Sequence, residues 1–175
     1  GEKVTSSATL ELTLLLAIFK FDRMEWAIEK CTELGVSRIV PVIARRTDAH
    51  LASAALKRSE RWRRIALQAS EQSRRAAPPE IAAPIKQQDA VSLPGALRIV
   101  LAESEQQTLL RDVLASSSPE PEILLAIGPE GGWADEELDL FRQSGWISAS
   151  LGSTVLRAET AAIAATAITI AELAP

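Results

Sequence analysis

Short apolar segments alternate along the chain with longer amphipathic ones, and this alternation limits the possible folds more than any other feature. The segments at 12–19, 36–43, 98–102 and 123–127 are almost wholly apolar and have the length of strands. Strands that are apolar on both faces are typical of parallel sheets covered by helices on both sides. The sequence therefore predicts an α/β fold with a mostly parallel sheet and helices on both faces.

The segments between these strands have the spacing of amphipathic helices. Asp22 is the expected N-cap of the first helix, which ends at Gly35 and carries Trp26 on its buried face. Residues 82–93 read as a connector that can hold a short strand. We expect further helices over residues 57–76, 106–115, 135–144 and 159–173, and a short strand over 146–151.

Length and composition exclude several classes of protein. The chain has 175 residues, of which 47% are hydrophobic and 24% are charged, so it predicts a single folded domain rather than a disordered chain. One cysteine, Cys31, and one histidine, His50, exclude a disulfide framework and argue against a metal site. The uncharged run 160–171 is too short to span a bilayer, so we expect no membrane partner and a cytoplasmic protein.

The charges are distributed unevenly along the chain. The formal net charge is −4, yet residues 38–75 contain ten basic and three acidic side chains. Seven of those ten bases lie at positions 57–75, mostly as arginine, which binds phosphate through its planar guanidinium. A local basic face on an acidic protein is typical of nucleic-acid binding, and a solvated helix surface is the alternative.

Residues 127–133 form the first candidate site. Gly128, Gly131 and Gly132 follow an apolar strand and precede a helix. Ligands of parallel α/β sheets bind beyond the carboxyl ends of strands, and glycines allow the backbone to approach a ligand closely. The segment matches neither the dinucleotide fingerprint nor the phosphate-binding P-loop, and a tight strand-to-helix turn is the alternative.

Residues 151–161 form the second candidate site, where a loop of small residues leads into the last helix. Glu159 is favourable near the N-terminus of that helix, whereas Arg157 opposes the helix dipole. A surface pair between the two is the simplest interpretation. The unfavourable position of Arg157 indicates that this side chain has another role.

These segments, in this order, resemble the small-subunit ribosomal RNA uracil-N3 methyltransferases. That family, the RsmE family, belongs to the SPOUT class of S-adenosylmethionine-dependent enzymes. The resemblance covers about residues 12–172 and is carried by five short motifs. These are residues 20–26, Lys30 with 33–36, 71–74, 128–132, and 151–152 with 155–161.

The resemblance implies a SPOUT methyltransferase domain over residues 9–175, with a trefoil knot in its C-terminal part and a homodimeric assembly. Residues 1–8 would then be a linker or a truncation scar, and the family's PUA-like RNA-binding domain would be missing from this chain. The implied reaction transfers a methyl group from S-adenosylmethionine to N3 of a uridine in small-subunit (16S) ribosomal RNA. Ribose 2′-O methylation and a non-enzymatic RNA-binding or ribosome-assembly role are the alternatives.

The resemblance also implies three loops that would hold S-adenosylmethionine. From the chemistry of the reaction we expect Arg157 to stabilise the developing uracil anion, because it neighbours a cofactor loop and the helix dipole does not explain its position. Glu159 would orient Arg157 or accept the proton, and Glu130 is the second candidate for that proton. Arg64, Arg74 and Arg75 would hold RNA phosphates. The expected cofactor-binding residues are Glu103, Ser104, Ile127, Gly128, Pro129, Glu130, Gly131, Gly132, Leu151, Gly152, Val155, Leu156 and Ala161.

Overall fold

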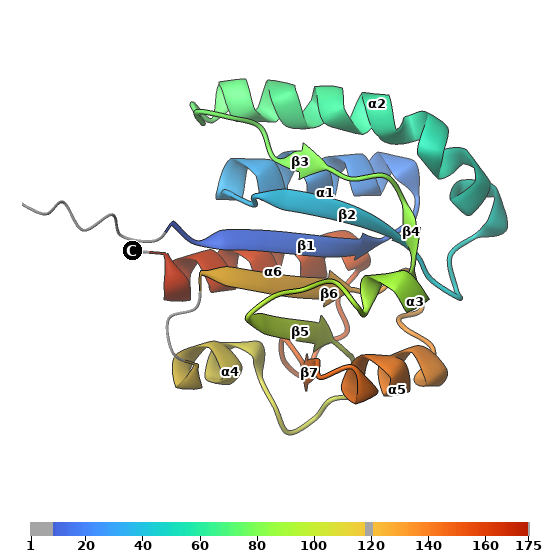
Figure 1. Cartoon of the computed structure of the whole chain (residues 1–175), viewed down its shortest axis with the longest axis vertical. Helices are drawn as coiled ribbons and strands as arrows, with labels where there is room; N and C mark the ends of the chain where they lie inside the picture. Colours follow the sequence, from blue (N-terminus) through green and yellow to red (C-terminus); the bar gives the residue numbers. More distant parts are fainter. Residues whose placement is uncertain (1–8, 118–120, 175) are drawn as a thin grey trace, which may run out of the picture.

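One parallel sheet forms the centre of the protein. The computed structural model describes residues 9–117 and 121–174 (Figure 1), so the predicted linker at 1–8 lies outside the described residues. The strands run in the order β3-β2-β1-β6-β5-β7, β4 also pairs with β2, and each of these pairings is parallel. The strands are β1 Glu11–Ala17, β2 Arg38–Ile43, β3 Glu80–Ile81, β4 Ile85–Lys86, β5 Leu97–Leu101, β6 Glu122–Ile127 and β7 Ile147–Ala149.

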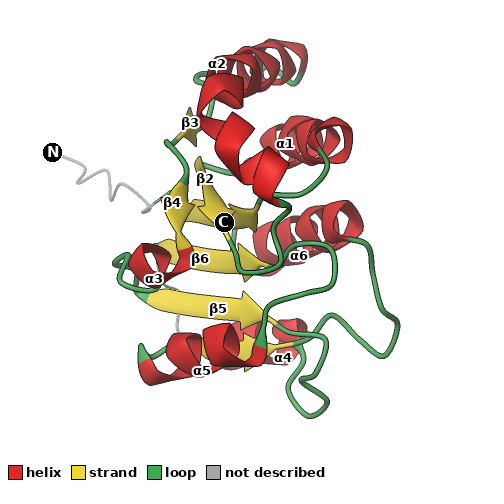
Figure 2. Cartoon of the chain, turned by 90° about the vertical axis from the view of Figure 1, so that its right-hand side faces the viewer, coloured by secondary structure: helices red, strands yellow, loops and turns green. Residues whose placement is uncertain are grey.

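Helices cover both faces of this sheet. The helices are α1 Phe21–Leu34, α2 Ala49–Gln72, α3 Gln87–Ala90, α4 Leu110–Ser116, α5 Asp135–Gln143 and α6 Ala158–Leu173. Helices α1, α2, α4 and α6 pack into one core cluster, and α3 and α5 pack into the other (Figure 2). The predicted α/β fold, with a mostly parallel sheet between two layers of helices, is therefore confirmed.

The central strands are apolar on both faces because each face meets a different core cluster. In β1, Leu12, Leu14 and Leu16 lie in the cluster with α1 and α6, whereas Leu15 and Ala17 lie in the cluster with α5. Burying such a strand from both sides contributes roughly 1.5–3 kcal/mol for each large side chain. This double burial explains why the strands read as continuous apolar runs.

Two expectations for the first helix are wrong. Lys20 is the residue before α1, so Asp22 lies inside the first turn, where a carboxylate is favourable for the helix dipole. Trp26 is 51% exposed, because the buried stripe of α1 follows Met24, Ile28 and Cys31 at helical spacing. Trp26 lies outside that stripe.

The second helix starts earlier and ends earlier than expected. It begins after Asp48, whose carboxylate accepts a hydrogen bond from the backbone N–H of His50 at 2.8 Å. Alanine-rich residues at 49–56 then extend the helix toward its N-terminus. The helix ends at Gln72, because Arg74 adopts a left-handed conformation with φ of 60°.

The fourth helix starts at Leu110 instead of residue 106. The Glu105 carboxylate accepts hydrogen bonds from the N–H groups of Gln107 and Thr108, which forms a turn. Thr108 then accepts a bond from the N–H of Ser150 at 2.9 Å, so this segment pairs with the chain after β7.

The last helix returns from the edge of the sheet to its middle. It follows β7, the edge strand, yet packs against α1 and α4 over β1 and β6 (Figure 2). The trefoil knot of this C-terminal part stays a prediction. Among residues 9–117 and 121–174, no helix has both the length and the apolar character that a bilayer span needs.

Candidate functional site

A cavity of about 630 Å³ opens at the edge of the sheet where the parallel strands end. Its walls come from the segments that follow β5, β6 and β7, together with side chains that follow β1 and β2. All the residues expected to bind the cofactor line it, namely 103–104, 127–132, 151–152, 155–156 and 161. The structure therefore brings the two glycine-containing segments into one site.

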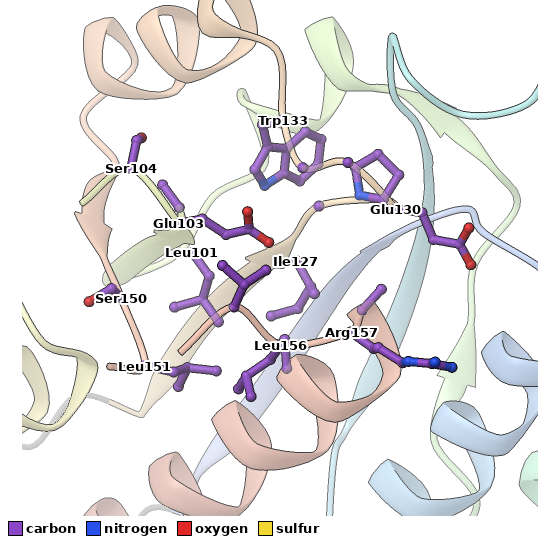
Figure 3. Close-up of a pocket in the computed structure, with 18 of the residues that line it drawn as sticks. Leu101, Glu103, Ser104, Ile127, Glu130, Trp133, Ser150, Leu151, Leu156 and Arg157 are labelled. Atoms are coloured by element: carbon purple, nitrogen blue, oxygen red, sulfur yellow. The ribbon is translucent and has the colours of Figure 1, made fainter. Parts of the chain in front are cut away.

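Apolar side chains form the centre of this cavity. Leu101, Ile127 and Leu156 gather there, and Arg157 and Glu130 extend away from them toward one side (Figure 3). An apolar centre with polar and charged groups around it is typical of pockets for small organic ligands. Among residues 9–117 and 121–174, no cluster of three or more His, Cys, Asp or Glu side chains could hold a metal ion.

The first glycine segment is a compact turn. Gly131 and Gly132 have φ values of 86° and 79°, a left-handed conformation that favours glycine, and the Gly132 N–H donates to the Pro129 carbonyl at 2.8 Å. A Cβ atom at Gly128 would lie 3.0 Å from the backbone nitrogen of Trp133. The backbone conformation thus favours glycine at 131 and 132, and the close contact favours it at 128, as the sequence indicated for the segment.

Packing against α5 holds the far end of this turn. The Trp133 indole meets Phe141 edge to face with ring centroids 4.9 Å apart. Glu137 accepts a hydrogen bond from the N–H of Ala134 at 3.0 Å and another from the N–H of Arg45 at 3.1 Å. The turn is therefore tied both to α5 and to the segment after β2.

The second glycine segment leads from β7 into α6. Gly152 has a φ of 150° and no atom within 4 Å of the place where a Cβ would lie, so it faces open space. Arg157 is the exposed residue immediately before α6. Its side chain lines the cavity and extends away from the apolar centre (Figure 3).

Glu159 is buried and contacts a partner that the sequence did not indicate. The residue is 5% exposed, and its Oε1 accepts a hydrogen bond from Nη1 of Arg23 on α1 at 3.4 Å. Its Oε2 has no hydrogen-bond partner among the described residues. The structure thus pairs Glu159 with Arg23 across two helices.

The arginines expected to bind RNA lie away from this cavity. Arg64 is exposed on α2, and Arg74 is exposed directly after it. Arg75 donates to the carbonyls of Thr32 and Val36 at 2.9 and 2.8 Å, and burial lowers the pKa of its guanidinium. Arg75 therefore holds the end of α1 in place, whereas Arg64 and Arg74 face solvent.

Sequence reasoning missed three cations that line the cavity, namely Lys20, Arg23 and Arg46. Lys20 and Arg46 follow the apolar segments 12–19 and 36–43 closely. Since the carboxyl ends of parallel strands meet at one edge of a sheet, that position was a usable signal. Arg23 lies on α1 rather than at the end of a strand, and it enters the site through the packing of α1 against α6.

A family model and known relatives match most of this chain. A family model described as RNA methyltransferase domain matches residues 6–170. The chain is 37% identical over 155 residues to ribosomal RNA small subunit methyltransferase E of Synechocystis, covering 87% of this chain and 50% of that protein. It is 38% identical over 159 residues to the Rickettsia conorii protein of that name, covering 89% and 62%.

Solved structures with S-adenosylmethionine have the same fold. A methyltransferase from Legionella pneumophila in complex with this cofactor superposes with a TM-score of 0.85 at 36% identity, covering 93% of this chain and 66% of that one. Ribosomal RNA small subunit methyltransferase E of Neisseria gonorrhoeae, bound to S-adenosylmethionine, gives 0.82 at 30%, covering 96% and 69%. The chain spans about half to two thirds of the length of its first curated relatives. It belongs to the RNA methyltransferase domain family, among the ribosomal RNA small subunit methyltransferases E.

Proposed function

We propose that the protein transfers a methyl group from S-adenosylmethionine to N3 of a uridine in small-subunit ribosomal RNA. The observation that carries this proposal is the meeting of two glycine-containing segments, around Gly128 and Gly152, in one cavity at the carboxyl ends of the strands. Relatives with 30% and 36% identity bind S-adenosylmethionine in their solved structures. Both facts favour a methyltransferase over an RNA-binding module without a cofactor.

The residues of the cavity fit S-adenosylmethionine. A volume of about 630 Å³ is within the range of roughly 300–1,000 Å³ for small-molecule sites. Leu101, Ile127 and Leu156 offer apolar contacts, and the left-handed glycines bring backbone groups to the wall. Glu103 and Glu130 at this wall would attract a cationic ligand. When bound, the cofactor supplies a methyl group on a positively charged sulfur.

The chain itself has two tasks in this reaction. Uracil N3 carries a proton, so it becomes a nucleophile only after that proton leaves, and the base then carries negative charge. We assign Arg157 to the stabilisation of this charge, since its guanidinium extends from the cavity toward solvent beside Leu156. Glu159 or Glu130, which also line the cavity, would accept the proton.

The ion pair with Arg23 gives Glu159 a second proposed role. This ion pair joins the first turn of α6 to the first turn of α1, and it therefore also fixes the direction in which the chain presents Arg157. Arg64 on the exposed surface of α2 and Arg74 beyond the end of that helix would contact RNA phosphates. We further propose that the protein acts as a homodimer in the cytoplasm.

Two measurements test this function. Calorimetric titration with S-adenosylmethionine comes first, and binding is expected. Small-subunit RNA and assembled small subunits are then incubated with the protein and cofactor, and the product nucleotide is identified by mass spectrometry. A methyl group on N3 of uridine supports the proposal, whereas ribose 2′-O methylation replaces it with the alternative reaction. RNA binding without any cofactor binding would indicate a ribosome-assembly module instead.

A further inference from the structure

We propose that Arg46 is a positioning residue that holds the Gly128–Gly132 segment in the shape that binds the cofactor. The role of that segment in cofactor binding rests on the proposed function. Arg46 follows β2 and lines the cavity. No other long side chain from the segment after β2 lines this cavity among the described residues.

The contacts of Arg46 are directed at the backbone of the glycine segment. Its Nη1 donates to the carbonyl of Gly131 and also, at 3.4 Å, to the carbonyl of Trp133. A Cβ atom at Gly131 would lie 3.6 Å from Cδ of Arg46, and one at Gly132 would lie 4.0 Å from Nη1. The arginine side chain therefore lies across both left-handed glycines.

The two segments joined in this way do not belong to neighbouring strands. Arg46 follows β2 and the glycine segment follows β6, and β1 lies between these strands in the sheet. The turn that carries Arg46 is itself closed, because the Ala44 N–H donates to Oγ1 of Thr47 and the Thr47 N–H donates to the Ala44 carbonyl, both at 3.1 Å. Arg46 therefore reaches over the end of β1 from an ordered turn.

Glycine makes this support necessary. Gly131 and Gly132 have more backbone freedom than any other residue type, so an unsupported turn of this kind loses more entropy when a ligand orders it. Among the described residues, the backbone hydrogen bond within this turn runs from the Gly132 N–H to the Pro129 carbonyl. Two further bonds from Arg46 reduce the freedom of the turn before the cofactor arrives, which preorganises the site.

Arg45 offers a matched control on the same turn. Its side chain forms an ion pair with Glu136 at 2.8 Å, and both groups are largely exposed. Its link to Glu137 runs through its backbone N–H, which a substitution leaves in place. Arg45→Ala thus removes one arginine from the turn without removing a contact to Gly131 or Trp133.

The test compares Arg46→Ala, Arg46→Lys and Arg45→Ala with the parent protein. Arg46→Ala removes two hydrogen bonds from a charged donor. We therefore expect its affinity for S-adenosylmethionine, measured by calorimetry, to fall about tenfold or more. Arg46→Lys is expected to recover part of that loss, since an ammonium can donate to one of the two carbonyls. Arg45→Ala is expected to bind the cofactor within about twofold of the parent, because surface ion pairs contribute little.

Hydrogen exchange without any cofactor separates this inference from the proposed function. The amides of residues 131–133 are expected to exchange faster in Arg46→Ala than in the parent and in Arg45→Ala. Unchanged exchange of these amides would overturn the positioning role. If the affinity of Arg46→Ala for S-adenosylmethionine still fell in that case, the loss would come from a direct contact between Arg46 and the ligand. If the parent itself bound no S-adenosylmethionine, the proposed function would fail, and the exchange result would still decide whether Arg46 holds the segment.

Discussion

Arg157 and Glu159 lie two residues apart at the start of α6, yet their surroundings differ. Arg157 is exposed at the N-cap position, where its positive charge opposes the helix dipole at a cost of about 0.3–1 kcal/mol. Glu159 is 5% exposed and accepts a hydrogen bond from Arg23. The carboxylate thus stabilises the first turn of α6, whereas the Arg157 guanidinium makes no hydrogen bond or ion pair within residues 9–117 and 121–174.

Replacement of Arg157 by alanine tests its proposed role. Loss of a charge that stabilises the transition state is expected to lower the methylation rate by about 10²–10³-fold. Cofactor affinity is expected to stay within a few-fold of the parent, since the methyl donor does not need this charge. The melting temperature is expected to stay equal or rise, because a cation leaves the N-terminus of a helix.

Arg111→Ala serves as the control for Arg157→Ala. Arg111 is an exposed arginine in the first turn of α4, and it does not line the cavity. Its replacement is expected to leave both the rate and the affinity unchanged. Near-normal turnover in Arg157→Ala would show that another group stabilises the anion.

The strands of this protein could be predicted from its sequence far better than the ends of its helices. Strands β1 and β6 are buried on both faces, so each appears in the sequence as a continuous apolar run that identifies it. The start of α2 depends on a single hydrogen bond from the His50 N–H to the Asp48 carboxylate. Whether Trp26 lies on the buried or the exposed face of α1 depends on the residue at which that helix begins. Such local choices leave only a weak pattern in the sequence.

Arg74, two residues after the end of α2, has a positive φ of 60°. Among the described residues it is the non-glycine residue with this backbone conformation. Its N–H donates to the Glu71 carbonyl at 3.2 Å, and the N–H of Arg75 donates to the Ser70 carbonyl at 2.9 Å. This pattern ends a helix with a left-handed residue, a position at which glycine is usual. A side chain there costs roughly 1–2 kcal/mol relative to ordinary backbone conformations.

Arg74→Gly is therefore expected to stabilise the protein. Relief of the left-handed conformation outweighs the entropy that glycine adds to the unfolded chain, about 0.4–1 kcal/mol, so a net gain of up to about 1 kcal/mol is expected. Urea denaturation followed by circular dichroism measures this change in the free energy of unfolding. Arg64→Gly is the control, since glycine in the exposed middle of α2 is expected to cost about 1 kcal/mol. Equal destabilisation by both variants would contradict the argument.

The site as a whole assembles residues from distant parts of the chain, between Lys20 and Ala161. That the two glycine-containing segments share one cavity could be predicted because each follows a strand, and parallel strands all end at one edge of the sheet. The contacts of Arg23 with Glu159 and of Arg46 with Gly131 could not, because they depend on how α1 packs on α6 and how one turn reaches over β1. The sequence thus indicates the place of the site, and tertiary packing determines its charged groups.

Cys31 reports on the integrity of this packing, because it lies where α1 meets α6. The thiol is fully buried and 3.6 Å from Oγ1 of Thr166, and burial raises its pKa to about 11. The thiolate is the reactive form, so the native protein is expected to resist a disulfide reagent at pH 8 until α6 leaves α1. The labelling rate is then expected to follow global unfolding as urea is added.

The same burial predicts how stability changes with pH. The thiol of the unfolded chain has its ordinary pKa of 9.0, and that of the folded chain is about 11, so unfolding releases a proton above pH 9. This contribution to the free energy of unfolding is therefore fully present below pH 9 and is lost as pH rises through about 11. Cys31→Ala removes the contribution, and its stability is expected to fall less between pH 9 and 11. Rapid labelling of Cys31 in the native protein, as fast as that of an exposed thiol in the double variant Cys31→Ala with Ser53→Cys, would show instead that α6 detaches locally from α1.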